Sequence, residues 1–237
     1  MGQVVILAGA TGTGKSTSIR NLDTKETYVI NVLGKRLPFE GSTIKYNEGN
    51  KNIASVANYN EVKSIVKAIS EQRKEVKNLI IDDIGFVMTT EFFSRVLEKG
   101  YEKFTEIGLH MQQIIQAGKD SRDDLKVVLL FHEDFDYNEK TRINKKVKTI
   151  GALLDDKYDP LAVVSVALFT DVVFDKDGKA TYNFLTSRTM VDRVLVPAKS
   201  PEGMFKELRI PNDLKMVFDR MDEYYGSTLV KQLETVN

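Results

Sequence analysis

The sequence contains no cysteine among its 237 residues. This absence excludes disulfide bonds, zinc sites built from thiolates and catalysis by a thiol nucleophile, and it fits a reducing compartment. Histidine is also scarce, and the two that occur, His110 and His132, lack partners at the spacing that a zinc site requires. We interpret His110, which lies within a predicted helix, as a structural residue. Zinc and thiol chemistry are therefore not expected.

An excess of charge of one sign and long hydrophobic runs are missing as well. Lysine and arginine together number 34, as do aspartate and glutamate, so contact with nucleic acid would need a local basic patch. No apolar stretch approaches the roughly 18 residues of a membrane span, and the first predicted strand starts too early for a signal peptide. Hydrophobic residues make up 42% of the chain, enough for a buried core. We expect a single domain over residues 1–237, in the cytoplasm and without a membrane partner.

The most specific motif that is present is GATGTGKST, residues 9–17, which follows an apolar run at 4–8. Its spacing satisfies G-x-x-x-x-G-K-[ST], the phosphate-binding P-loop between a strand and a helix, and the residues after it, SIRNL, can open that helix. Glycines let backbone N–H groups turn inward around phosphates, Lys15 would reach the β- and γ-phosphates, and the Ser16 hydroxyl would bind Mg²⁺. A tight turn without a ligand would explain the glycines but not the adjoining Lys-Ser. The predicted phosphate site comprises Gly9, Ala10, Thr11, Gly12, Thr13, Gly14, Lys15, Ser16 and Thr17.

A second acidic element follows in NLIIDDIG, residues 78–85. Asp82 ends an apolar run at the position where open α/β sheets gather ligands, so we assign it, with Ser16, to Mg²⁺ binding as the Walker B aspartate. The next residue, Asp83, is a candidate to orient or deprotonate the attacking water, a role that many relatives of this class give to a glutamate. Glu40 and Glu133 are the alternatives for this base.

Hydrophobic patterning predicts alternating strands and helices along the rest of the chain. Strands are predicted over 26–32 and 124–133, and helices over 58–76, with Asn60 as its N-cap, and over 101–120. The fold class is thus α/β, with a mostly parallel sheet, right-handed crossovers and helices on both faces. We expect residues 161–237 to add a β-hairpin that turns at Asp177-Gly178 and a final helix capped by Asn212 or Asp213.

Several segments together resemble the phage nucleotide-binding proteins of the RecA-like single-strand annealing group. The resemblance rests on the P-loop, LIIDD at 79–83, LLFHE at 129–133, KTIGALLDDK at 148–157, SPEGMF at 200–205 and a terminal helix with Tyr-Tyr-Gly. It implies a RecA-like P-loop core, ATP with Mg²⁺, homo-oligomers on single-stranded DNA and a role in phage recombination or replication in the host cytoplasm. A single-strand binding protein is a further candidate partner. From the motifs and from the strand that ends in His132, our candidate catalytic residues are Lys15, Asp82, Asp83 and His132.

The segment 134–148 is the predicted DNA contact, and we expect an exposed loop or hairpin with a turn near Asn138. A chain without net positive charge must concentrate its cations to bind a polyanion, and this segment holds the densest cluster, with aromatic rings close by for base stacking. The alternative is a solvated hairpin whose lysines balance its own carboxylates. The candidate DNA-binding residues are Phe135, Tyr137, Lys140, Arg142, Lys145 and Lys146.

Two features of the site stay open at this point. His132 ends a strand that in RecA-like sheets lies beside the Walker B strand, so it can either sense the γ-phosphate or bond to a neighbouring loop. ATPases of this group generally complete their site with a cation from the next subunit. The candidates for that cation are Lys146, Lys148, Arg188 and Arg193.

The function itself also has alternatives. Annealing or strand exchange on single-stranded DNA is the main hypothesis, and a motor for DNA packaging or helicase loading is the second. The aspartate that replaces the usual glutamate after Asp82 leaves room for a weakly hydrolysing, nucleotide-dependent switch. A small-molecule kinase is disfavoured because no arginine-rich lid with an acceptor site is recognisable.

Overall fold

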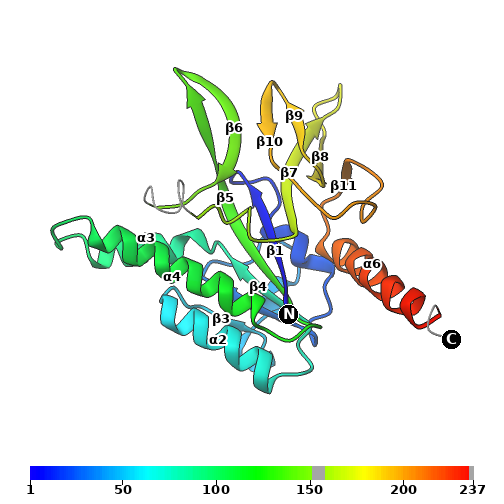
Figure 1. The fold of residues 1–237 in the computed structure, drawn as a ribbon, viewed down its shortest axis with the longest axis horizontal. Helices are drawn as coiled ribbons and strands as arrows, with labels where there is room; N and C mark the ends of the chain where they lie inside the picture. The colour runs from blue at the N-terminus through cyan, green and yellow to red at the C-terminus, as the bar shows by residue number, and fades with distance from the viewer. Residues whose placement is uncertain (151–157, 235–237) are drawn as a thin grey trace.

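The fold is that of a computed structural model of the chain, which describes residues 1–150 and 158–234 (Figure 1). Eight strands form the main sheet in the order β11-β8-β7-β1-β5-β4-β2-β3. All pairs from β3 to β7 along this order are parallel, and only β7–β8 and β8–β11 are antiparallel. The mostly parallel α/β sheet expected from the sequence is therefore confirmed. The strand bounds are β1 Gln3–Gly9, β2 Thr27–Asn31, β3 Ile53–Ala54, β4 Asn78–Asp82, β5 Lys126–Asn138, β7 Val166–Phe174, β8 Ala180–Leu185 and β11 Arg209–Pro211.

Helices cover both faces of this sheet because both faces of its central strands are apolar. In β1, Val4 and Ile6 pack into the core with the helices α2, α3 and α4, whereas Val5 and Leu7 pack on the other side with η1 and α6. The longer of these helices are α2 Tyr59–Gln72, α3 Gly85–Ser94, α4 Glu102–Lys119 and α6 Leu214–Glu234, and η1 Ser16–Asn21 is a 3₁₀ helix. Short turns of helix, α1 Ser42–Lys45 and η2 Glu48–Asn50, follow β2. No helix within the described parts of the chain is long and apolar enough to cross a membrane.

The start of α2 and the element after the P-loop differ from the sequence-based expectations, whereas α6 is capped by Asp213, one of its two expected caps. Helix α2 is capped by Asn58, not Asn60, because Asn58 has an extended backbone and its side chain accepts hydrogen bonds from the N–H groups of Asn60 and Glu61. At α6, the Asp213 carboxylate accepts from the N–H of Lys215 at 2.9 Å, which leaves Asn212 free to contact another element. The P-loop leads into the short 3₁₀ helix η1 and not into a long α-helix.

Two hairpins extend from the sheet where the turn signals predict them. β5 continues past the main sheet and pairs with β6 Thr141–Val147, with Glu139 and Lys140 as the two residues of the turn. β7 and β8 are joined through Asp177-Gly178, where Gly178 has a φ of 78° that favours glycine. The strands β9 Thr189–Val191 and β10 Val194–Val196 pair with each other, and β10 also pairs with β6.

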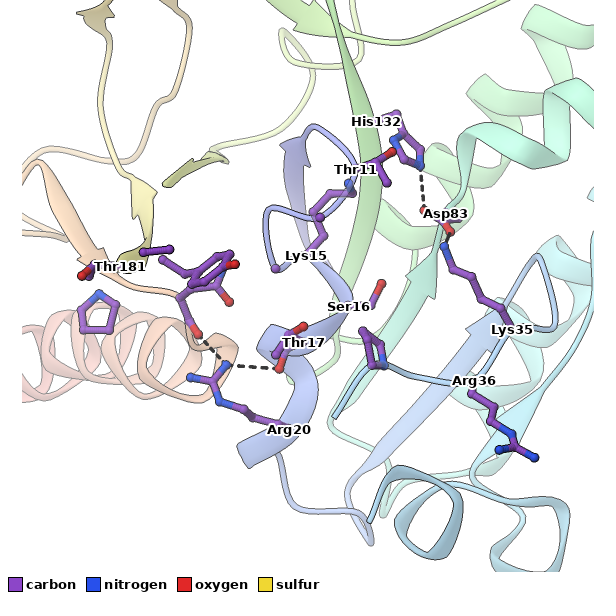
Figure 2. A pocket seen from close by; sticks show the side chains of 17 residues that line it. Thr11, Lys15, Ser16, Thr17, Arg20, Lys35, Arg36, Asp83, His132 and Thr181 are labelled. Carbon is purple, nitrogen blue, oxygen red and sulfur yellow. Dashed lines mark hydrogen bonds and ion pairs between the residues drawn. The ribbon is translucent and has the colours of Figure 1, made fainter. Parts of the chain in front are cut away.

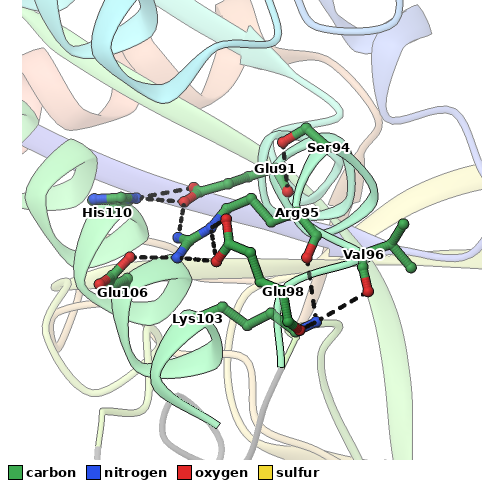
Figure 3. A network of polar contacts seen from close by, with 8 residues as sticks. All are labelled: Glu91, Ser94, Arg95, Val96, Glu98, Lys103, Glu106 and His110. Carbon is green, nitrogen blue, oxygen red and sulfur yellow. Dashed lines mark hydrogen bonds and ion pairs between the residues drawn. The ribbon is translucent and has the colours of Figure 1, made fainter. Parts of the chain in front are cut away.

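A polar network fastens α3 to α4 (Figure 3). Arg95, at the end of α3, forms ion pairs with Glu91 at 3.1 Å, with Glu98 at 2.7 Å and with Glu106 of α4 at 2.6 Å. His110 of α4 lies 2.8 Å from Glu91 and its ring stacks on Tyr59 of α2, with centroids 3.5 Å apart. These contacts give His110 the structural role that its helical position indicated.

Candidate functional site

The P-loop begins where β1 ends, and its glycines are required by its surroundings. A Cβ on Gly9 would stand 1.8 Å from the Thr170 hydroxyl of β7, so only glycine fits. Gly12 and Gly14 have φ values of 79° and 91°, in the left-handed region that side chains disfavour. The sequence pattern of the loop thus corresponds to a backbone that packs closely and turns sharply.

Lys15 is folded across this loop. Its Nζ donates to the carbonyl oxygens of Gly9 at 2.9 Å and Ala10 at 2.8 Å. Burial lowers the pKa of Lys15, while the charges of Asp83 and Asp82 act in the opposite direction. The lysine charge is therefore held over the P-loop.

Ser16 and Asp82 meet although they lie far apart in the sequence. The Ser16 hydroxyl donates to Oδ1 of Asp82 at 2.8 Å, and the Asp82 side chain is fully buried. Burial, together with the charge of Asp83, raises the pKa of Asp82 to about 6. Its second oxygen, Oδ2, has no hydrogen-bond partner in the described structure. Buried polar atoms normally have a hydrogen-bond partner or a ligand, so this oxygen is a candidate to bind one.

These oxygens fit Mg²⁺ bound jointly with phosphates. Magnesium is commonly held by one or two carboxylates plus substrate phosphates and water. Within the described residues there is no cluster of three or more His, Cys, Asp or Glu side chains that would hold a metal alone. Ser16 and Asp82 would therefore hold Mg²⁺ together with a bound nucleotide.

Asp83 binds two side chains at once (Figure 2). His132 Nε2 lies 3.1 Å from its Oδ1, and the Lys35 ammonium forms an ion pair with its Oδ2. Burial alone would raise the pKa of Asp83, but the hydrogen bonds from His132 and Lys35 outweigh it and hold the pKa at about 2. Asp83 also has a φ of 60°, in the left-handed region that Asp tolerates better than most residues. It is thus an ionised carboxylate fixed beside the P-loop.

His132 reaches Asp83 from the strand between the two motifs. β5 pairs with β1 on one side, where His132 stands opposite Gly9, and with β4 on the other. The predicted neighbourhood of this strand and the Walker B strand is therefore confirmed. The His132 ring also packs edge-on against Phe86, with centroids 5.8 Å apart. His132 therefore contacts Asp83, in the segment predicted as Walker B. Its role in sensing the γ-phosphate stays a prediction.

A cavity of about 800 Å³ lies beside the P-loop and includes residues that the motifs did not indicate. Lys35 and Arg36 enter from the loop after β2 (Figure 2). Tyr182 of β8 and Pro211 of β11 also line the cavity. Asn212 follows β11, donates through Nδ2 to the Thr13 carbonyl at 3.4 Å and limits the space at Gly14. In the sequence, Gly34 could have indicated the turn that brings Lys35 and Arg36 to the cavity. No local signal marks Tyr182 or Asn212, because distant pairing brings them to the loop.

The DNA candidates of the β5–β6 hairpin fall into two groups. Lys145 forms an ion pair with Glu133 at 2.9 Å, and Lys146 pairs with Asp136 at 3.2 Å, as the solvated-hairpin alternative requires. The second group is exposed, and it comprises Tyr137, Lys140 and Arg142, whose guanidinium lies 4.2 Å from the centre of the Phe135 ring. The exposed group is the better DNA candidate.

None of the remaining candidates lines the cavity beside the P-loop. Glu133 is engaged with Lys145, and Glu40 is exposed and does not line the cavity. Arg188 borders a separate cavity of about 440 Å³, together with Lys145 and Lys146. Arg193 lies in the turn between β9 and β10, and Lys148 borders a cavity of about 430 Å³ next to His132. Of KTIGALLDDK, residues 151–157 lie outside the described residues.

No protein-family model matches the chain, and no curated protein matches its sequence. Assignment to the RecA-like annealing group therefore stays a prediction.

Proposed function

We propose that this chain is a RecA-like P-loop ATPase that binds ATP with Mg²⁺, hydrolyses it and acts on single-stranded DNA in phage recombination or replication. The contact between Ser16 and Asp82 carries the proposal. It joins the two predicted Mg²⁺ ligands at 2.8 Å across 66 residues of sequence, next to a cavity of about 800 Å³. A P-loop, a candidate metal-binding pair and a fixed carboxylate thus lie close together, and phosphoryl transfer needs these parts.

Each side chain has a defined task in this reaction. Lys15 would exchange the carbonyls of its own loop for the β- and γ-phosphates, and Ser16 and Asp82 would hold Mg²⁺, which neutralises phosphate charge when it is bound. Asp83 would orient the attacking water and accept its proton. As the water oxygen bonds to the γ-phosphorus, the bond from phosphorus to the bridging oxygen breaks and its electron pair stays on ADP.

The wider assignment has support from the sheet and from the hairpin. Strand β5 separates the P-loop strand from the Walker B strand and carries His132 between them, the arrangement expected of a RecA-like core. The same strand continues into the hairpin that exposes Tyr137, Lys140 and Arg142. Homo-oligomers on DNA in the host cytoplasm, and a single-strand binding protein as a partner, complete the proposal.

A nucleotide-dependent switch is the second candidate. Asp83 is shorter than the usual glutamate, and both of its oxygens are engaged by Lys35 and His132. A carboxylate held in this way activates water poorly until one partner leaves. A protein that binds ATP tightly and turns it over very slowly would fit this observation.

The test compares Lys15→Ala with the parent protein. We expect Lys15→Ala to lose turnover and to bind ATP at least about tenfold more weakly, because the buried ammonium no longer offsets phosphate charge. Calorimetric titration with ATP and Mg²⁺, and phosphate release with and without an oligonucleotide, give these values. Lys25→Ala, an exposed lysine before β2, is the matched control.

Three outcomes separate the alternatives. Unchanged binding and turnover in Lys15→Ala would contradict the ATP site. If the ATP turnover rate of the parent protein is the same with and without single-stranded DNA, the DNA-dependent function is contradicted. Tight binding with negligible turnover would favour the switch.

A further inference from the structure

The end of β2 holds the loop that carries Lys35. Asn31 is the last residue of β2, stands opposite Asp82 of β4 and donates from Nδ2 to the Lys35 carbonyl at 2.6 Å. The N–H of Val32 donates to the Asp82 carbonyl at 3.2 Å, and Gly34, at a φ of 64°, turns the chain. The backbone of Lys35 is therefore fixed with respect to the Walker B strand.

The Lys35 side chain returns from this loop to the phosphate end of the cavity (Figure 2). Its ammonium pairs with Oδ2 of Asp83, whose side chain is 2% exposed, while the Lys35 side chain itself is 50% exposed. One partner is thus buried and fixed, and the other has solvent-exposed space in which to turn. Lys15 lines the same cavity from the P-loop, so two ammonium groups approach one site.

The contacts of Asp83 allow Lys35 to leave. His132 remains on Oδ1 at 3.1 Å when Lys35 leaves Oδ2, so the carboxylate keeps one strong partner. Lysine is a compact charge on a flexible four-carbon stem, which suits transfer between two anions. The γ-phosphate carries more negative charge than a single carboxylate, and charge-assisted bonds to it are strong.

We propose that Lys35 is a second catalytic lysine of this site, which moves from Asp83 to the γ-phosphate of ATP bound to the same chain. This inference rests on the proposed ATPase function. On the γ-phosphate, Lys35 stabilises the charge that develops during transfer, and its departure frees Oδ2 of Asp83 for the attacking water. The same movement couples the arrival of a γ-phosphate to the release of Asp83. When ADP is bound instead, the Asp83 carboxylate stays paired with Lys35.

The test separates recognition of the γ-phosphate from general nucleotide binding. Lys35→Ala, Lys35→Arg and the control Lys25→Ala are titrated with Mg²⁺-ADP and with the non-hydrolysable analogue Mg²⁺-AMP-PNP. We expect Lys35→Ala to bind ADP like the parent protein, and its preference for AMP-PNP over ADP to fall about ten- to a hundredfold. Its turnover should fall about 10²–10³-fold, and its capture of ADP with aluminium fluoride should be lost. Lys35→Arg keeps the charge and should retain most of the preference.

Thermal unfolding of the same variants completes the experiment. If Lys35→Ala only lowers the melting temperature, with the AMP-PNP preference and aluminium fluoride capture of the parent protein, Lys35 merely anchors Asp83 and the inference is overturned. If the parent protein binds neither nucleotide, the ATPase proposal fails and takes this inference with it. The two failures are therefore distinguishable.

Discussion

Asp83 is under tighter constraint than its neighbours in the site. Its backbone is left-handed at a φ of 60°, its side chain is 2% exposed, and each carboxylate oxygen has a basic partner. Left-handed backbone costs most residues free energy, but Asn and Asp tolerate it because of their short polar side chains. The position therefore accepts few replacements, and asparagine is the one that changes charge alone.

Asp83→Asn should separate binding from chemistry. The variant keeps the shape and the backbone conformation but cannot accept a proton, so we expect nucleotide affinity to be retained and single-turnover hydrolysis to fall about 10²–10⁴-fold. Asp177→Asn, in the exposed turn of the β7–β8 hairpin, is the control. Rapid-quench measurement at saturating ATP checks this, and hydrolysis at the parental rate would assign the water to another group.

Residues within motifs could be predicted from the sequence, and residues outside them could not. Ser16 was predicted as a Mg²⁺ ligand from the P-loop spacing and Asp82 from its place at the end of an apolar strand, and the structure brings the two side chains to 2.8 Å. Lys35 was not identified, because a lysine in a polar loop has the pattern of any solvated surface charge. Its place depends on the bond from Asn31 to its backbone, which no periodicity reveals.

Among the elements, α3 was missed because its sequence hides the helical period. GFVMTTEFFS carries apolar residues on nearly every side, so the 3.6-residue alternation of buried and exposed positions is absent. The β5–β6 hairpin was predicted, because its alternating polar residues and turn signal are local. What the sequence could not show is how its cations are partnered across the two strands.

The hairpin's two groups of cations should behave differently toward single-stranded DNA. We expect Lys140→Ala with Arg142→Ala to weaken binding to all sequences and to flatten the salt dependence by roughly 0.7 for each phosphate that the variant no longer neutralises. Tyr137→Ala should weaken binding by about 1–3 kcal/mol if a base stacks on its ring, with the salt slope almost unchanged.

Fluorescence anisotropy across a salt series, with an ATP analogue present, measures both effects. Lys145→Ala with Lys146→Ala is the comparison, because these two lysines pair with Glu133 and Asp136 of the hairpin. If the variant with Lys140→Ala and Arg142→Ala binds DNA with the affinity of the parent protein at every salt concentration, this hairpin is not part of the DNA interface.

The molecule as a whole assembles the cavity of about 800 Å³ from both ends of the chain. The P-loop and Lys35 come from the first 40 residues, whereas Tyr182 lies in β8 and Asn212 directly follows β11, two strands that join β1 through β7. Such long-range pairing leaves no trace in a local pattern, which is why this wall of the cavity was not predicted. The surface on which a neighbouring subunit would contact the cavity also cannot be predicted from local sequence patterns, because it depends on how subunits assemble.

Mixing variants tests which groups share one chain. Lys15 and Lys35 line the same cavity, so we expect a mixture of Lys15→Ala and Lys35→Ala proteins to stay inactive at all concentrations. ATPase activity of the mixture against protein concentration is the measurement, and recovery would mean that Lys35 serves a neighbour's site. The same mixing with Arg188→Ala, or with a variant of Lys146, Lys148 or Arg193, should recover activity only for a residue that acts across subunits.

Strand β5 connects the wall of the cavity, at His132, to the tip of the hairpin. It runs from Lys126 to Asn138, with His132 at its midpoint and an irregularity only between Asp136 and Tyr137. The six residues from His132 to the tip span about 20 Å, so a tilt of about 5° at His132 displaces the tip by about 2 Å. A tilt of β5 at His132 would therefore move the exposed tip of the hairpin, which lies well outside the cavity.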